Sequence, residues 1–514
     1  MSQETGTEAA HGQSDTAAPA PGAARRLAAV VYRWLAADLF RRTENVPVSW
    51  RKVLLAVAGV VVAIVISLSR TRGPGSLNTI WIEDAKFLLN QGLNLPFSQA
   101  IASPISSYYQ EPARLFTAIA IQFPLAWAPG VMAIFAAGQY ALYGLIAYIA
   151  SGPYLRSRWL RLLIAAPVCA LPLAYTQVNN DLVTVQFFGL FGAFWTLLWL
   201  PGTRAGKILS PIVMATVSWT AALSVVFAPL VLARLIVDRS KNAWAVAILW
   251  AGGVWLQFSE TITGKSHHQS FGRNSLSFVV HNFVSRVVPR ALFGERSLGG
   301  AGVNYQGKYA PLHVLSPAGH HALIIGAWVI VLVVIALAAF RFTHPNWTLA
   351  VVAALFSFGI FLEEMLINTA VVQARYVVAP ALLLYTALVA LLRVRPMAKT
   401  ATVSDAHEAD ISRGDDPPYP PSSASGGRRA ASPIARIAAT PARAALRWLP
   451  VAGFAVLLLV AVTLNFRVTN GRTTSAPWTS VVASATTACK VPGVTAYTYV
   501  HEWWWVTIPC GRVG

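Results

Sequence analysis

Apolar residues along the chain come in blocks of about twenty, separated by short polar or basic segments. A block of this length spans the hydrocarbon core of a bilayer as an α-helix. The pattern predicts eleven membrane-spanning helices, at residues 52–69, 131–151, 159–176, 183–200, 208–219, 221–236, 243–259, 321–340, 347–364, 376–392 and 448–466. The chain is therefore predicted to be an all-α, polytopic membrane protein.

The distribution of basic residues sets the predicted orientation, because Lys and Arg are concentrated on the cytoplasmic side of membrane proteins. The two short blocks within 208–236 are interpreted as an up-and-back pair, since Lys207 precedes them and Arg239 follows. The apolar stretch 115–127 is interpreted as a helix along the outer surface, because counting it as a crossing would place the basic loop 152–161 outside. With eleven crossings, the N-terminus is cytoplasmic and the C-terminus is extracytoplasmic.

The segments outside the main block of helices are polar or amphipathic. Residues 1–24 and 393–447 are rich in Ala, Pro, Ser and Gly, a composition that cannot build a core, and are predicted to be a disordered cytoplasmic tail and linker. Residues 25–49 alternate arginines with apolar residues, which predicts an amphipathic helix on the membrane surface. The last crossing, at 448–466, is followed by an extracytoplasmic tail at 467–514.

The composition excludes a soluble enzyme. Of the 514 residues, 55% are hydrophobic and only 12% are charged, whereas a soluble protein carries roughly a quarter charged residues. The net charge of +20 would suggest nucleic-acid binding on a soluble domain. Here most Lys and Arg residues fall on the predicted cytoplasmic side, so we expect membrane lipids as partners, no nucleic acid, and a location in the plasma membrane.

The C-terminal tail contains two cysteines, Cys489 and Cys510, in a predicted oxidising compartment, which favours a disulfide between them. This bond would close a small β-rich cap. The tryptophans at 503–505 precede Cys510 and have two interpretations: they stack on sugar faces, or they anchor the tail at the membrane interface.

Adjacent carboxylates occur in the first predicted outer loop, where Glu83 and Asp84 precede an amphipathic helical run. This arrangement places one acid at a helix start, where the helix dipole favours negative charge. The acids are either a reactive pair at the membrane surface or a helix cap with a solvated neighbour. Glu363 and Glu364, at the end of a later span, are either functional or simply partners of Arg375.

The motif Trp81-Ile82-Glu83-Asp84, followed by an apolar run and Gly92, resembles the acidic first loop of GT-C glycosyltransferases, and most closely that of actinobacterial multi-pass members. The tyrosine-containing stretch 107–114 resembles the segment that follows in that family, although it lacks the usual Pro-Arg dipeptide. Ala85 also departs from the family, in which Gly is usual. The resemblance covers about residues 50–392 and implies a GT-C-like bundle with outer juxtamembrane helices.

Two further motifs belong to the same resemblance. Asn180 and Asp181 lie in a segment similar to the Asn-containing second outer loop of the family, and Arg375-Tyr376 begins a segment similar to its RYxxxP motif. In such an enzyme one carboxylate is the general base for an inverting sugar transfer from a polyprenyl-phosphate donor. The resemblance implies Asp84 as this base, with Glu83 as the alternative.

The other residues then take binding roles. Arg375 and Tyr376 would bind the donor phosphate, and Asn180 and Asp181 would bind sugar hydroxyls or help to hold a divalent cation, which is possible but not required. The acceptor would be an extracytoplasmic glycan, lipid or protein.

The long outer loop 260–320 contains a basic group formed by Lys265, His267 and His268. Adjacent histidines face different ways on a helix or strand, which argues against a metal site. We expect these residues to bind the lipid phosphate or to contact anionic headgroups.

Two other functions remain open at this point. The chain is alternatively a transporter or flippase for a lipid-linked cell-envelope precursor, or a non-catalytic scaffold with a GT-C-like fold. Transporters often show internal repeats and charged residues in the middle of spans. This chain shows neither, and its unusual polar residues cluster at one predicted face, which favours the enzyme.

Overall fold

The structure is a computed structural model of the chain. It describes residues 23–43, 49–105, 108–173, 179–262, 274–295, 298, 317–367, 373–394, 446–467, 471–501 and 504–513. It is mostly helical (75%). The predicted tail 1–24 and linker 393–447 lie outside these residues, apart from a few at their ends.

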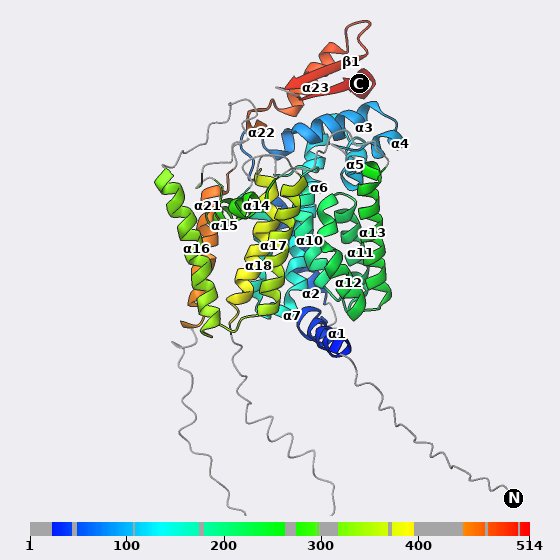
Figure 1. Cartoon of the computed structure of the whole chain (residues 1–514). Helices are drawn as coiled ribbons and strands as arrows, with labels where there is room; N and C mark the ends of the chain where they lie inside the picture. Colours follow the sequence, from blue (N-terminus) through cyan, green and yellow to red (C-terminus); the bar gives the residue numbers. More distant parts are fainter. Residues whose placement is uncertain are drawn as a thin grey trace, which may run out of the picture.

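Two apolar helices, α10 (Val185–Leu198) and α18 (Val378–Leu391), lie in the middle of the helical bundle (Figure 1). All their residues are buried, as expected for helices that are apolar on every side. Helix α6 (Ala128–Ala150) packs against α10. This approach requires a glycine, because a Cβ at Gly192 would lie 2.6 Å from the ring of Tyr143.

Other helices surround this centre. They include α2 (Trp50–Leu68) against α6, α17 (Trp347–Ile367) against α18, and α11 (Arg204–Ser218) against α13 (Lys241–Ile262). The remaining helices of the bundle are α12 (Ala228–Val237), α14 (Leu276–Asn282), α15 (Val288–Phe293), α16 (Pro317–Ala339) and α21 (Leu449–Asn465).

Five helices in the described ranges are long and apolar enough to cross a membrane: Trp50–Leu68, Leu125–Ala150, Ala318–Ala339, Trp347–Leu366 and Ala374–Leu391. Three apolar helices are shorter: Val185–Leu198, Ala222–Val237 and Leu449–Asn465. The helical membrane class is therefore confirmed, whereas the number of crossings stays a prediction.

One predicted crossing is interrupted. The segment 159–176 forms α8 (Arg158–Ala165) and the short α9 (Pro167–Ala170), and residues 174–178 lie outside the description. Pro167 has no backbone N–H to donate, so it starts a new helix. The segment 221–236 likewise begins as the 3-10 helix η5 (Ala222–Phe227) before α12.

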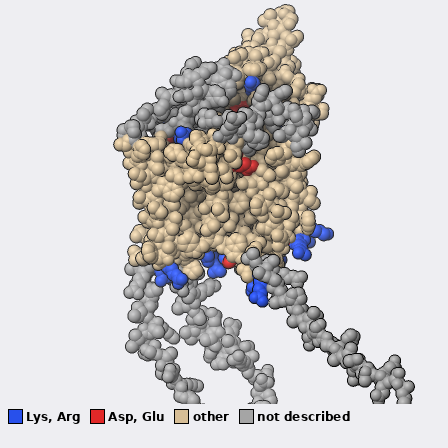
Figure 2. All heavy atoms as spheres, in the orientation of Figure 1, with Lys and Arg blue, Asp and Glu red and all other residues tan. Residues whose placement is uncertain are grey.

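Basic side chains gather at the end of the bundle that carries α1 (Ala23–Trp34) and α7 (Gly152–Leu155) (Figure 2). Tyr154 holds this end together, since its hydroxyl donates to carbonyls of η1 (Leu35–Leu39) and α10. Helix α1 exposes several large apolar side chains, as a surface helix would: Val30, Val31, Tyr32 and Trp34. It starts earlier than the predicted 25–49, and the helical run ends at Leu39.

The opposite end carries three short helices, α3 (Asn90–Asn94), α4 (Phe97–Ile101) and α5 (Glu111–Ala120) (Figure 1). Ten residues of α-helix rise roughly 15 Å, so α5 is too short to cross a membrane. This agrees with the prediction that the stretch 115–127 is no crossing. Its last residues nevertheless differ, because the 3-10 helix η4 (Leu125–Trp127) leads directly into α6.

The C-terminal tail folds at this same end. It contains α22 (Gly471–Thr474), α23 (Trp478–Ala488) and an antiparallel hairpin of β1 (Ala496–His501) and β2 (Trp504–Pro509). Cys489 and Cys510 form the predicted disulfide, with their Cα atoms 5.4 Å apart, so this prediction is confirmed.

Candidate active site

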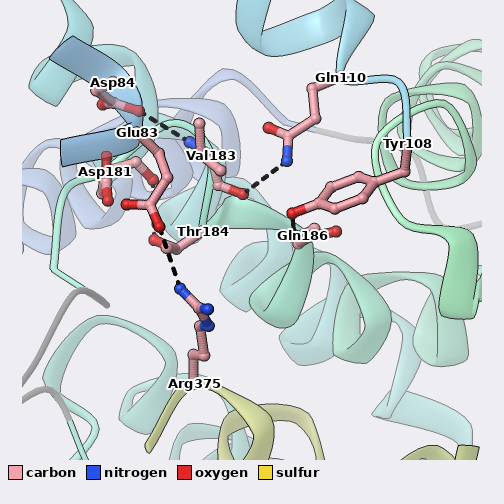
Figure 3. A network of polar contacts seen from close by, with 9 residues as sticks. All are labelled: Glu83, Asp84, Tyr108, Gln110, Asp181, Val183, Thr184, Gln186 and Arg375. Atoms are coloured by element: carbon pink, nitrogen blue, oxygen red, sulfur yellow. Dashed lines mark hydrogen bonds and ion pairs between the residues drawn. The ribbon is translucent and has the colours of Figure 1, made fainter. Parts of the chain in front are cut away.

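Asp84 begins the π-helix η3 (Asp84–Leu89) in the first loop at this end. Its carboxylate accepts hydrogen bonds from the backbone N–H groups of Leu182 (2.8 Å) and Val183 (3.0 Å) (Figure 3). The residue is only 3% exposed. The acid at a helix start was predicted, but its bonds go to another segment, 98 residues away, rather than to its own helix. Asp84 therefore joins two loops.

Asp181 lies beside Asp84 in this interior (Figure 3). It is 1% exposed, and its carboxyl group lies within hydrogen-bonding reach of that of Asp84, with no other hydrogen-bond partner among the described residues. Burial and the neighbouring charge of Asp84 raise the pKa of Asp181 well above its ordinary value, and burial also raises the pKa of Asp84. Two adjacent buried carboxylates do not both ionise readily, so the pair holds a proton to higher pH than two separate carboxyl groups would.

Arg472, which sequence reasoning missed, holds the two loops together from the C-terminal tail. Its buried guanidinium donates to Thr79 Oγ1 (2.9 Å) and to the carbonyls of Ser76 (3.1 Å), Thr79 (2.8 Å), Asn179 (3.0 Å) and Asn180 (3.1 Å). Its charge also favours the ionised forms of Asp84 and Asp181, lowering the pKa of both. No motif or periodicity marks this single arginine in the polar tail.

Asn180 is completely buried and has a left-handed backbone conformation (φ 56°), which Asn tolerates better than most residues. Its side-chain amide donates to the Ser67 carbonyl (2.9 Å) and Ser76 Oγ (3.0 Å), and accepts from Ser67 Oγ (2.7 Å). Its amide joins the end of α2 to the first loop and positions the neighbouring Asp181. The binding of sugar hydroxyls or a divalent cation by Asn180 and Asp181 stays a prediction.

Glu83 points away from Asp84 and toward Arg375 (Figure 3). Arg375 Nη1 and Glu83 Oε1 are 3.4 Å apart, and the two side chains are 20% and 17% exposed. Arg375 starts the 3-10 helix η8 (Ala374–Val377), and its guanidinium lies 5.4 Å from the ring centre of Tyr376. Burial raises the pKa of Glu83, while Arg375 acts in the opposite direction. The structure thus brings the predicted residues Glu83, Arg375 and Tyr376 together.

Tyr108 lies close to the same charged residues. Burial raises the pKa of its hydroxyl most, the charge of Arg375 lowers it, and the charges of Glu83 and Glu364 raise it. Gln186 Nε2 donates to its hydroxyl (3.4 Å) (Figure 3). Glu364 also interacts electrostatically with the hydroxyl of Tyr376. The resemblance drew attention to the stretch around Tyr108, but its position beside the charged pair is found only in the structure.

The hairpin of the tail packs on the first loop. Trp504 is 1% exposed, and its ring lies 6.4 Å from that of Trp81, two residues before Glu83. Lys86 Nζ lies 4.5 Å from the ring centre of Trp505, and Asn90 Oδ1 accepts from the N–H of Thr507 (2.8 Å). Trp504 therefore neither stacks on a sugar nor anchors at the interface, because it packs inside the protein.

Three predicted residues, Lys265, His267 and His268, lie outside the described residues. Within the described ranges, no group of three or more His, Cys, Asp or Glu residues could hold a metal ion. Neither models of protein families, nor curated proteins, nor solved structures match this chain.

The proton shared by Asp84 and Asp181 predicts that the stability of the protein depends on pH. Asp181→Asn should reduce this dependence. Unfolded carboxyl groups ionise near pH 4, whereas the buried pair keeps its proton at higher pH. The folded state then binds more protons than the unfolded state, so stability falls as the pH rises above about 4. In a pH series of thermal unfolding midpoints (Tm), Asp181→Asn should lose less stability toward neutral pH than the parent. Asp38→Asn, at the opposite end of the bundle, should show the same slope of Tm against pH as the parent. An equal slope for Asp181→Asn and Asp38→Asn would contradict the shared proton.

Proposed function

We propose that the chain is a GT-C-type membrane glycosyltransferase of the plasma membrane. It transfers a sugar from a polyprenyl-phosphate donor to an extracytoplasmic glycan, lipid or protein. The observation that carries the proposal is the Glu83–Arg375 pair, which places an acid and a cation together at one end of the bundle, with Asp84 and Asp181 behind it.

The orientation is part of the proposal. The basic end of the bundle faces the cytoplasm, in line with the positive-inside rule. The acidic site and the disulfide-closed tail then face outward, where disulfides persist. Eleven crossings place the N-terminus inside and the C-terminus outside.

Glu83 is the better candidate for the general base, although the sequence favoured Asp84. A base must come within about 2.6–3.2 Å of the acceptor hydroxyl. Both oxygens of Asp84 accept backbone hydrogen bonds, from Leu182 and Val183, whereas Glu83 Oε2 has no hydrogen-bond partner among the described residues and can accept one from an acceptor hydroxyl. In this assignment Asp84 and Asp181 fix the loop, and Glu83 performs the proton transfer.

The reaction follows from this assignment. The acceptor oxygen forms a bond to the anomeric carbon as Glu83 takes its proton, and the bond from that carbon to the phosphate oxygen breaks. Polyprenyl phosphate leaves with the electron pair, and the anomeric configuration is inverted. Arg375 stabilises the leaving phosphate, since a fixed cation acts strongly in a site shielded from water. A phosphate bound to Arg375 competes with Glu83 for the guanidinium and so frees the carboxylate for its role as base.

Transfer by the purified full chain in liposomes, supplied with labelled polyprenyl-phosphate sugars, tests this proposal. Arg375→Lys should lower the rate by about 10²-fold, because Lys lacks the planar fork of donors that fits a phosphate. Arg239→Lys, an exposed arginine at the basic end, should leave the rate unchanged. Absence of transfer by the parent chain with every donor would contradict the proposal. Movement of the intact lipid across the bilayer in that case would identify a flippase.

A further inference from the structure

A cavity lies at the same end of the bundle as the carboxylates and is lined by other residues. It has a volume of about 280 Å³ and is enclosed by η3, α3, α4 and α5. Its floor is apolar and is formed mainly by Leu88, Leu95, Phe97, Ile101 and Ile121. A cavity of this shape accepts a segment of hydrocarbon chain rather than a polar ligand.

Two arginines line this apolar cavity, Arg114 from α5 and Arg512 from the tail. Arg114 is 5% exposed and donates one hydrogen bond, to Gln91 Oε1 (2.8 Å), while its Nε has no hydrogen-bond partner among the described residues. Arg512 is exposed and lies two residues after Cys510, so the disulfide restricts its position. A buried guanidinium nitrogen without a partner is costly, and an anion in the cavity would satisfy it.

The surface around the cavity is strongly apolar. Phe97 is 58% exposed and Trp127 is 61% exposed, and Leu115, Ile119 and Phe123 are each 44% exposed. Such side chains at the end of a helical bundle match the boundary between hydrocarbon and headgroups, where tryptophan is enriched. An apolar surface of this kind favours a lipid over a water-soluble molecule as the occupant of the cavity.

We propose that this cavity binds one anionic phospholipid of the surrounding bilayer. An acyl chain lies on the apolar floor, and the phosphate is held by Arg114 and Arg512. Charge complementarity selects an anionic headgroup, because the two guanidinium groups provide the positive charge that the phosphate needs. Leu88 lines the cavity four residues after Asp84, so the bound lipid contacts η3 directly. The inference does not depend on the proposed sugar transfer.

Binding of phosphatidylglycerol and phosphatidylcholine to the full chain in detergent tests the proposal, with native mass spectrometry for stoichiometry and Tm for stabilisation. We expect one phosphatidylglycerol to bind at least tenfold more tightly than phosphatidylcholine and to raise Tm progressively as its concentration increases. Arg512→Gln should remove this preference, and because Arg512 is exposed the variant should fold normally. Ala118→Phe, which fills the cavity, should weaken binding of both lipids. Arg239→Gln should behave as the parent.

Four results would overturn the proposal. Equal binding of the two lipids would remove the anionic preference, and unchanged binding by both Arg512→Gln and Ala118→Phe would place the lipid elsewhere. Full stabilisation by inorganic phosphate alone would identify a site for a free anion. Preferential binding of polyprenyl phosphate over phosphatidylglycerol would assign the cavity to a sugar donor. Transfer activity is not read in this experiment, so its outcome is independent of the proposed reaction.

Discussion

Replacing Glu83 by Gln is expected to lower the rate of sugar transfer by about 10²- to 10⁴-fold, the usual contribution of a general base. Gln has nearly the same volume and keeps an oxygen that accepts a hydrogen bond from Arg375, so the local packing is preserved. It cannot take up the proton of the acceptor hydroxyl. Initial rates with a labelled polyprenyl-phosphate sugar, at saturating and limiting donor, would separate this loss from weaker donor binding.

Two variants serve as comparisons. Asp38→Asn removes an acid that also contacts an arginine, Arg41, but lies at the basic end, and it should leave the rate unchanged. Asp84→Asn should instead lower Tm. Each oxygen of Asp84 accepts one backbone N–H, from Leu182 or Val183, and in Asn one of these oxygens is replaced by an NH₂ group that would face an N–H donor. A stable Asp84→Asn protein without transfer, together with an active Glu83→Gln protein, would return the role of base to Asp84.

Replacing Arg472 by Gln is expected to destabilise the outer end by on the order of 3–5 kcal/mol, the usual cost of leaving a buried charge network without one member. The five hydrogen bonds of its guanidinium connect the tail to both acidic loops. Gln is too short to replace these hydrogen bonds. The substitution also removes the positive charge that acts on both Asp84 and Asp181. The Tm should fall, and proteases should cut the tail more readily.

Arg467→Gln is the matched control, because Arg467 lies in the same tail but is exposed and donates one bond, to the Ser69 carbonyl (2.8 Å). It should change Tm little. Arg472→Lys separates charge from geometry: it should lose most of the hydrogen bonds while the positive charge beside the two acids remains. A parental Tm and protease pattern for Arg472→Gln would show that the tail is held by the hairpin alone.

The helices of the bundle were predictable because burial in lipid and protein demands long apolar runs. The apolar blocks of α6, α16 and α17 appear in the structure within a few residues of their predicted bounds. The break at Pro167 was missed, since hydropathy alone treats an apolar proline as any other apolar residue. The prediction that 115–127 is no crossing came from the charge distribution rather than from hydropathy, and the shortness of α5 is compatible with it.

The site was predictable only in part. Glu83, Asp84, Asp181 and Arg375 stand out because charges are rare in this chain. Their pairing is decided by tertiary contacts: Asp84 is bonded to residues 98 and 99 positions away, and Glu83 contacts a residue 292 positions away. No local pattern reveals which of the two adjacent acids contacts Arg375 and which is bonded to the second loop, so the sequence alone does not decide between Asp84 and Glu83 as the base.

The position of Arg472 near the C-terminus has a consequence for biosynthesis. Ribosomes deliver Asp84 and Asp181 to the membrane long before residue 472 is translated, so the bundle can assemble while the acidic loops still lack the arginine that joins them. The contacts that join the two acidic loops therefore form only after residue 472 has been translated. A chain that ends before residue 472 would lack all five hydrogen bonds of this guanidinium.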